Sequence, residues 1–427
     1  MKRFLGMLLV LALLLGMVTA ASAEKSKIIF WALDHGTTRN TFIENLVKDY
    51  NAREDCEYEV ELTWFDENTY RQRLAAARAG GTMCDIFMNN YGNIPTDCNN
   101  EYALPLDDLL PKEVIDDITA KALVTYRDGK IYGYPMYVEP CTVAYYNKEM
   151  FAAAGIEEFP KTWAEFLEVL PKLTNEFVYG SHFMEGVWDN CYNQTAEHYL
   201  LNDDWTEANC QDQGYIDFLT FIKAMYDGGY VPQQNLYSQA EGWRAVATEA
   251  CATAFSGSWG VDTLIKDYPD MLDIIGIASF PAPTEDSVWH TTTGGWAWLI
   301  DSKTKVAEGA ADFIAWSIGG DPERMAQLYI DLNFSTYSPR ASVNAILEKY
   351  ADEHAGEFAV EAMRYISQNI VPYCVGEPIY SIDITVTYWI TMQQVMWNGM
   401  SPEDALADCA EKINTYLKNN EYWQYCP

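Results

Sequence analysis

A stretch near the N-terminus decides the fold. It begins with the short apolar run IIFWA at residues 28–32, which predicts a buried strand. Apolar side chains then recur at helical spacing over residues 42–50 (FIENLVKDY) and alternate with polar ones over residues 58–64 (YEVELTW). A second helical pattern covers residues 70–79 (YRQRLAAARA), and DIFM at residues 85–88 predicts the next strand. The order strand, helix, strand, helix, strand predicts a parallel sheet with crossover helices, and therefore an α/β fold.

The rest of the chain continues without a flexible linker. Thr162 and Glu165 form a capping box that opens a helix, and Ser401-Pro402 begins another one. The sequence contains no internal repeat and no low-complexity segment. At 427 residues the chain has the length of two to three domains, so two α/β lobes are the simplest interpretation.

The charge balance argues against two classes of partner. The chain has 28 Lys and Arg against 62 Asp and Glu, which gives a net charge of −34. Such an acidic chain repels phosphate backbones and anionic lipid headgroups, so we expect no nucleic acid partner and no membrane surface partner. Aromatic residues make up 14% of the chain. Most should be core residues, but Trp and Tyr also offer the flat apolar faces with a polar tip that binding surfaces use.

The N-terminus predicts export. Lys2 and Arg3 precede an apolar run from Phe4 to Val18, and Ala21-Ser22-Ala23 supplies a cleavage site of small residues. We interpret residues 1–23 as a cleavable signal peptide, because the run is too short for a membrane span and no stop-transfer pattern follows. The first cysteine is Cys56, so the sequence does not support a lipid-anchor cysteine. We expect a periplasmic, cell-surface or extracellular location.

The ten cysteines permit disulfides in an exported protein. No two of them have the Cys-x-x-Cys spacing of a redox motif or a zinc ribbon. Sequence alone does not fix connectivity. The short separations favour Cys84–Cys98, Cys191–Cys210 and Cys409–Cys426, and the alternative is ten buried thiols.

The motifs of several enzyme classes are missing from the sequence. It contains no Gly-x-Ser-x-Gly elbow, no P-loop and no Gly-x-Gly-x-x-Gly. The five histidines form no His-x-x-x-His pair, so we expect no metal and no cofactor. Carboxylates are abundant, and a glycoside hydrolase needs only two. A secreted glycoside hydrolase or polysaccharide-binding protein therefore stays open as the alternative to a non-enzymatic binding protein.

Five segments, in their order and spacing, carry a family resemblance. They are CDIFMNN at residues 84–90, GKIYGYP at 129–135 running on to Glu139 and YYNK at 145–148, FSGSW at 255–259, GGW at 294–296, and the helix start at 401–406. Together they resemble the extracellular solute-binding proteins of bacterial ABC importers, in particular the sugar-binding, maltose-binding-protein-like group. The ten cysteines and the missing anchor cysteine depart from the pattern of that group.

The resemblance implies an α/β, two-lobed periplasmic-binding-protein clamshell with three interlobe crossings, each lobe a mainly parallel sheet flanked by helices. The N-terminal lobe would comprise residues 24–138 and 284–335, and the C-terminal lobe residues 139–283 and 336–427. Such a protein captures a sugar or oligosaccharide in the interlobe cleft and delivers it to the transmembrane subunits of a permease. It would act as a monomer without a cofactor.

The resemblance also places ligand contacts, because loops at the carboxyl ends of parallel strands face the cleft. Glu139 stands at the first crossing as a carboxylate for sugar hydroxyls, and Trp259 and Trp389 match stacking tryptophans of the family. The other candidates lie at strand ends, in loops and at the third crossing: Trp31, Asp34, His35, Asn89, Asn90, Tyr91, Trp188, Asp189, Gly295, Trp296, Tyr337 and Arg340. For each, a role in the core, in a turn or in the hinge is the alternative. Because these positions supply amides, indoles and a carboxylate rather than an Arg cluster, we expect a neutral or cationic ligand.

Overall fold

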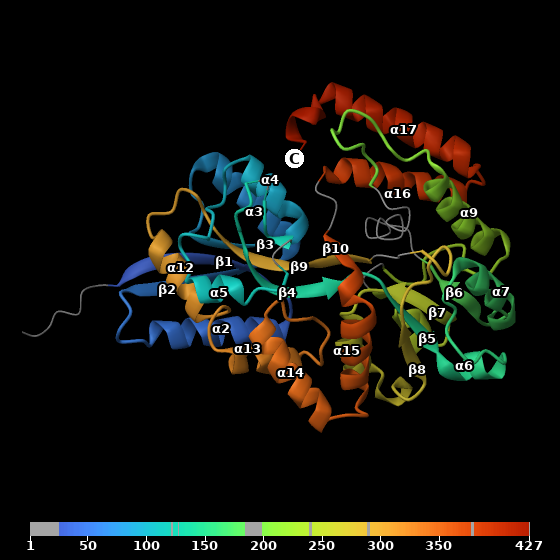
Figure 1. Cartoon of the computed structure of the whole chain (residues 1–427), viewed down its shortest axis with the longest axis horizontal. Coiled ribbons are helices and arrows are strands. Elements are labelled where there is room, and N and C mark those ends of the chain that lie inside the picture. Colours follow the sequence, from blue (N-terminus) through green and yellow to red (C-terminus); the bar gives the residue numbers. More distant parts are fainter. Residues whose placement is uncertain are drawn as a thin grey trace, which may run out of the picture.

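Two β-sheets form the centres of two lobes (Figure 1). The computed structural model describes residues 25–120, 123–126, 128–183, 199–238, 241–287, 291–376 and 380–426. Within these ranges, no helix combines the length and the apolar character needed to cross a membrane.

The first sheet has six strands. Its strand order is β10 (Cys374–Gly376), β9 (Thr291–Ile300), β3 (Ile86–Asn90), β1 (Ser26–Leu33) and β2 (Tyr58–Phe65), and β4 (Tyr134–Pro140) also pairs with β9. The second sheet has the order β6 (Tyr179–His182), β7 (Cys251–Ser256), β5 (Val143–Asn147) and β8 (Ile275–Ala278).

Helices cover both sheets (Figure 1). Around the first sheet lie α2 (Thr37–Asn51), α3 (Glu67–Gly80), α4 (Ile94–Asn99), α5 (Lys112–Asp116), α12 (Ala307–Trp316), α13 (Pro322–Asp331) and α14 (Ala341–Glu353). With the second sheet lie α6 (Lys148–Ala153), α7 (Trp163–Leu173), α9 (Gln213–Asp227), α10 (Arg244–Ala247), α11 (Gly260–Asp267), α15 (Phe358–Asn369), α16 (Ile382–Met396) and α17 (Pro402–Asn419). Short 3-10 helices cover Tyr91–Asn93, Pro269–Met271, Val371–Tyr373 and Tyr422–Tyr425.

The local predictions are confirmed. The first five predicted elements correspond to β1, α2, β2, α3 and β3, with boundaries shifted by a few residues. Thr162 and Glu165 form both hydrogen bonds of the capping box of α7, and the Ser401 side chain accepts from the backbone N–H of Asp404 at the start of α17. Gly81 ends α3 in the left-handed conformation that glycine adopts without steric cost.

The sheets are mixed, whereas the sequence predicted mainly parallel ones. Strands β1, β2 and β3 are parallel, but β9 runs antiparallel to β3 and to β4. In the second sheet, β5 runs antiparallel to both β7 and β8. The first two crossings explain the pairing of β4 with β9. Strand β4 leads the chain out of the first lobe and β9 brings it back, so the two strands lie side by side in opposite directions.

The chain passes from the first sheet to the second between β4 and β5, returns between β8 and β9, and leaves again after α14, and β10 then rejoins the first sheet before α16. Strand β10, which the predicted boundaries assign to the second lobe, pairs with β9 of the first sheet. Helix α14, assigned to the same lobe, packs against α13. The lobe boundaries therefore stay a prediction.

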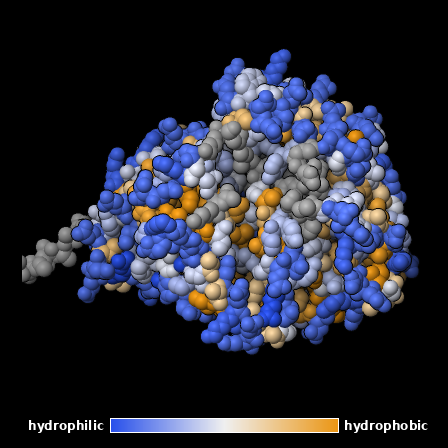
Figure 2. Space-filling model, in the orientation of Figure 1, coloured by the Kyte–Doolittle hydropathy of each residue, from blue (hydrophilic) through white to orange (hydrophobic). Residues whose placement is uncertain are grey.

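The hydrophobic core consists mainly of two clusters. The larger one surrounds the first sheet, where Phe30 packs against Trp298 with ring centroids 4.6 Å apart, and it extends across the first crossing to Tyr145 and Trp243. The second cluster fills the space between the second sheet and α7, α9, α16 and α17. Hydrophilic residues dominate the outer face seen in Figure 2, as the high net charge requires.

Two of the predicted disulfides are not formed. Cys84 and Cys409 are thiols, which rules out Cys84–Cys98 and Cys409–Cys426 in this structure. Cys84 instead forms a hydrogen bond with the backbone of Trp31, and the Cys409 thiol forms a hydrogen bond with the Cys210 thiol. The pair Cys191–Cys210 involves a residue outside the described ranges.

Candidate functional site

An ion pair marks the first crossing. Glu139 lies near the end of β4, opposite Gly294 of β9, where the chain leaves the first sheet. Arg39 on α2 donates from Nη2 to Glu139 Oε1 at 3.0 Å. Only 13% of the Arg39 side chain and 14% of the Glu139 side chain are exposed, so this charge-assisted bond is shielded from water.

Three aromatic rings continue the network. The Arg39 guanidinium lies over the Tyr137 ring, 4.5 Å from its centroid. The Tyr137 hydroxyl and His35 Nδ1 are 2.7 Å apart, and the edge of the Trp296 indole meets the imidazole at a centroid distance of 4.6 Å. We call Arg39, Glu139, Tyr137, His35 and Trp296 the crossing network. It joins the end of β1, the start of α2, β4 and β9.

Burial sets the charges of the crossing network. Burial raises the pKa of Glu139, and the nearby Arg39 guanidinium acts in the opposite direction. Burial lowers the pKa of His35 to about 3, and the positive charge of Arg39 adds to this effect. His35 is therefore neutral at pH 7, and the network combines one ion pair with a neutral imidazole.

Gly295 allows β4 and β9 to come close together beside the network. It adopts a φ of +133°, and an added Cβ would lie 2.3 Å from the backbone oxygen of Tyr137. The Tyr91 hydroxyl donates to the same oxygen at 2.6 Å. Trp296 itself pairs with Asn90 on one side and Tyr137 on the other. The structure thus brings the predicted residues His35, Tyr91, Glu139, Gly295 and Trp296 together.

Other predicted residues have their polar groups engaged within the first lobe. Asn89 is buried and donates to Asp97 Oδ2 at 2.7 Å, while its Oδ1 accepts from Asn93 at 3.1 Å. The Asn90 side chain accepts from the backbone N–H of Asn93 and caps the turn that follows β3. Amide chemistry at this strand end therefore organises the turn.

Two further candidates from the end of β1 lie beside the network. Asp34 is exposed and accepts from Gly36 and Asn40, and these two bonds lower its pKa. Trp31 is half-buried and meets Phe65 edge to face at 5.3 Å.

The two predicted stacking tryptophans come from different helices. Trp259 is half-buried and stands directly before α11, and the backbone N–H of its neighbour Ser258 donates to Pro140 at 3.0 Å, next to Glu139. Trp389 is half-buried on α16, and its indole N–H has no acceptor among the described residues. Trp188 and Asp189 lie outside the described residues.

Arg340 and Tyr337 both contact elements of the first lobe. Arg340 is buried and donates to the Asp117 carboxylate at 2.7 Å and to two backbone oxygens, those of Ile318 at 2.9 Å and Gly320 at 2.8 Å. Tyr337 exchanges two backbone hydrogen bonds of 2.8 Å with Val138 of β4. Both residues are therefore engaged in contacts within the fold, and their role in ligand binding stays a prediction.

Arg39 and Tyr137 belong to the network but were not predicted from the sequence. Arg39 lies 100 residues from Glu139 in the chain and carries no motif. Tyr137 stands within the segment that resembles the family, but only the fold shows that it bridges Arg39 and His35.

Comparison with known proteins identifies the family. Residues 45–355 match the family model described as bacterial extracellular solute-binding protein. The chain belongs to this family. The solute-binding protein is 20% identical over 394 residues to a maltooligosaccharide ABC transporter solute-binding lipoprotein of Streptococcus pneumoniae, covering 88% of this chain and 85% of the relative. It is 23% identical to an arabinooligosaccharide-binding protein of Bacillus subtilis, covering 75% and 77% of the two chains.

Solved structures show the same fold. The sugar-binding protein MalE from Xanthomonas citri superposes with a TM-score of 0.78 at 19% identity, covering 93% of the solute-binding protein and 98% of that chain. The two-lobed α/β architecture expected from the sequence is confirmed.

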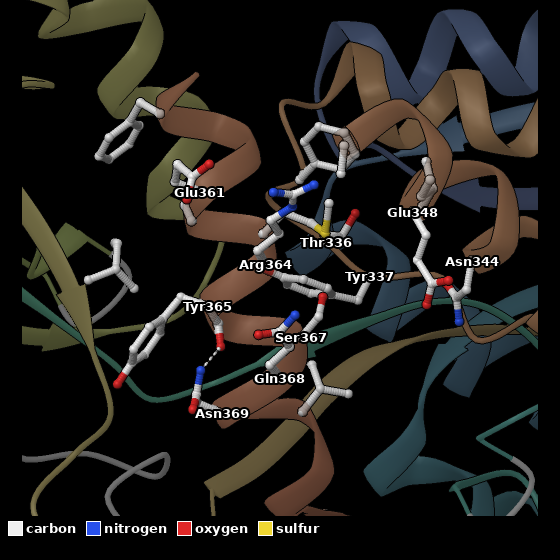
Figure 3. Close-up of a pocket in the computed structure, with 18 of the residues that line it drawn as sticks. Thr336, Tyr337, Asn344, Glu348, Glu361, Arg364, Tyr365, Ser367, Gln368 and Asn369 are labelled. Atoms are coloured by element: carbon white, nitrogen blue, oxygen red, sulfur yellow. Dashed lines mark hydrogen bonds between the residues drawn. The ribbon is translucent and has the colours of Figure 1, made fainter. Parts of the chain in front are cut away.

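A separate cavity of about 1010 Å³ lies between α14, α15 and β8 of the solute-binding protein (Figure 3). Among the predicted site residues within the described ranges, only Tyr337 lines it. Polar side chains of α15 point toward it, including Arg364 and Gln368, and Arg364 also pairs with Asp352 at 2.6 Å. The described residues contain no group of three or more His, Cys, Asp or Glu side chains that could hold a metal ion.

Proposed function

We propose that this solute-binding protein is the extracytoplasmic substrate-binding component of an ABC importer. It captures a sugar or oligosaccharide between its lobes and delivers it to the transmembrane subunits of the permease. The crossing network carries this proposal, because it sets the half-buried Trp296 indole beside charged and hydroxyl groups. A pyranose ring has an apolar C–H face that packs on an indole and a rim of hydroxyls that bond to such groups.

The charges of the crossing network favour a neutral ligand. Arg39 compensates Glu139, and His35 is uncharged at pH 7 because its pKa is about 3. A cationic ligand would compete with Arg39 for the carboxylate, and an anionic one would compete with Glu139 for the guanidinium. A neutral saccharide brings no charge that would compete with either partner of this ion pair.

The lobes move as a clamshell in this proposal. The N-terminal lobe comprises residues 24–138 and 284–335, the C-terminal lobe residues 139–283 and 336–427, and the hinge lies in the crossings between them. Hinge closure around a ligand is the usual motion of periplasmic binding proteins. The protein works as a monomer and reaches its compartment through the signal peptide at residues 1–23, which lies outside the described residues. Its membership of an extracellular family supports export.

The curated relatives favour transport over hydrolysis, because they are named as binding proteins. A glycoside hydrolase needs one protonated and one ionised carboxyl group across the glycosidic bond. In the crossing network Glu139 is held in an ion pair, which suits binding rather than proton donation.

A thermal-shift screen tests the proposal. Neutral oligosaccharides of maltose and arabinose type should raise the Tm in proportion to the logarithm of their concentration over Kd. Sugar phosphates and uronates should leave the Tm unchanged. A shift with the acidic sugars alone would refute a neutral ligand, and release of shorter sugars from the bound oligosaccharide would refute a purely binding role.

A variant of Trp259 tests the proposed stacking contact. Trp259→Ala should remove apolar contact worth about 2 kcal/mol, which corresponds to a roughly 30-fold weaker affinity in calorimetric titration. The matched control is Trp397→Ala, because that indole is 40% exposed at the end of α16. If Trp259 is a core residue instead, its removal should cost about 3–5 kcal/mol of stability and leave the affinity of the folded protein unchanged.

A further inference from the structure

Two buried thiols meet in the second lobe. Cys210 lies just before α9, and Cys409 lies in the middle of α17. Both are completely buried in the same hydrophobic cluster, and their side chains form a hydrogen bond with each other. They are 199 positions apart in the chain, and the sequence paired each of them with a different cysteine.

The elements that carry the two thiols are held firmly. Helix α17 packs against both α16 and α9, and Tyr388 of α16 meets Tyr215 of α9 edge to face at 5.5 Å. Cys409 also bonds to Thr391 of α16. The pair therefore lies at the junction of three helices whose packing leaves the backbone little room to move. Because the two thiols are already in contact, only a small shift of their side chains is needed to join them.

A metal does not account for the pair. A structural zinc site takes four ligands, mostly cysteine and histidine. In the described part of the chain no third His, Cys, Asp or Glu joins these two cysteines. Two adjacent thiols without further metal ligands can be oxidised to a disulfide in the compartment of an exported protein.

We propose that Cys210 and Cys409 form a disulfide in the exported protein, which links α9 to α17. Two S–H bonds break and one S–S bond forms. The two electrons and two protons pass to the disulfide of an oxidising partner, either a thiol–disulfide oxidoreductase or a low-molecular-weight disulfide, and reduce it to two thiol groups. The inference rests on export but not on the identity of the ligand.

The surroundings of the pair determine when the bond forms. The thiolate is the nucleophile in thiol–disulfide exchange. Both thiols are completely buried, so an oxidant has little access to them in the folded reduced protein. The bond therefore forms while the chain folds. Once formed, it is shielded from reductants by the same burial.

Peptide mapping tests the pairing without any variant. The reduced full-length protein is refolded in mixed oxidised and reduced glutathione, unfolded in N-ethylmaleimide, and digested with trypsin and a Glu-specific protease. Both proteases are needed, because no Lys or Arg separates Cys191 from Cys210 or Cys374 from Cys409, whereas Glu207 and Glu403 do. We expect the Cys210 and Cys409 peptides to be linked. Alkylation of both cysteines, or a link from Cys210 to Cys191, would overturn the proposal.

The reductant dependence of the Tm provides the second test. A phosphine reductant present during refolding should lower the Tm of the wild-type protein by several degrees, because the disulfide constrains the unfolded chain. Cys210→Ser and Cys409→Ser should lose this dependence. Cys251→Ser is the matched control, since Cys251 is equally buried and burial alone raises its pKa to about 12. It should keep the dependence. A dependence that persists in both test variants would show that another bond is responsible, whatever the sugar screen shows.

Discussion

Removing Arg39 is the most informative perturbation of the crossing network. Arg39→Met keeps an unbranched, flexible side chain but leaves the Glu139 carboxylate without its partner at 3.0 Å. Because the two side chains are only 13% and 14% exposed, the cost should be that of breaking a buried pair, about 3–5 kcal/mol of unfolding free energy. The lost contact with the Tyr137 ring contributes to this cost.

The pH dependence of this cost identifies its origin. Without Arg39, burial raises the pKa of Glu139 further above its ordinary value of 4.5. Between pH 4.5 and the raised pKa of the folded variant, Glu139 is protonated in the folded protein but ionised in the unfolded chain. The free energy of unfolding of the variant therefore falls as the pH rises through this window. We expect a smaller cost at about pH 4 than at about pH 7, measured by urea denaturation.

Two further variants make this prediction refutable. Arg39→Met/Glu139→Leu removes both charges and should recover most of the lost stability at neutral pH. Arg364→Met is the control, because Arg364 pairs with an Asp352 side chain that is 82% exposed, and it should cost less than about 1 kcal/mol. If Arg39→Met costs no more than this control, or if its cost is the same at both pH values, Glu139 is not a buried charge that depends on Arg39.

Three more predictions concern single residues. The pKa of His35 is about 3 in the folded protein against an ordinary 6.5, so between these two values only the unfolded chain is protonated at this residue. The free energy of unfolding should therefore rise with pH from about 3 to 6.5, by at most about 5 kcal/mol. His35→Gln should flatten the rise in urea titrations, and an unchanged slope would contradict the assignment. Gly295→Ala should lower stability by roughly 1–3 kcal/mol or more, because the residue has a φ of +133° and an added Cβ would clash with the facing strand. Gly81→Ala is the control and should cost about 1 kcal/mol, because open space surrounds this glycine. Equal losses of stability in thermal unfolding would refute the clash. Arg340→Met should cost about 3–5 kcal/mol because three of its nitrogens donate within the fold, against less than about 1 kcal/mol for Arg364→Met, and ligand affinity should be unchanged by either variant. A selective loss of affinity in the Arg340 variant would restore it as a ligand contact.

Local patterns were sufficient to predict the first half of the N-terminal lobe. Each predicted strand or helix there has its own period of apolar residues, and the helix start at Thr162 has a capping box whose four residues are consecutive. The mixed order of the sheets was not predictable in this way. It depends on β9, which is neighbour to β3, β4 and β10 but adjacent to none of them in sequence.

The candidate site was predictable only in part. Family resemblance pointed to Glu139, but its ionisation and accessibility depend on Arg39 from a helix 100 residues earlier. Arg340 shows the opposite case. Its position beside the third crossing left ligand contact and hinge packing open, and only the fold shows that its guanidinium is engaged by Asp117 and two carbonyl groups. Ionic contacts over such separations leave no local pattern.

The place of β9 in the first sheet has a consequence for biogenesis. The sheet begins with Ser26 and is complete only when Gly376 has been synthesised, because β9 and β10 are its last strands. Pairings over such separations are slow to form, since the chain loses much entropy before the contact repays it. For a member of an extracellular family this delay is useful. A growing chain that cannot close its central sheet stays extended enough to be threaded through a secretion channel before it folds.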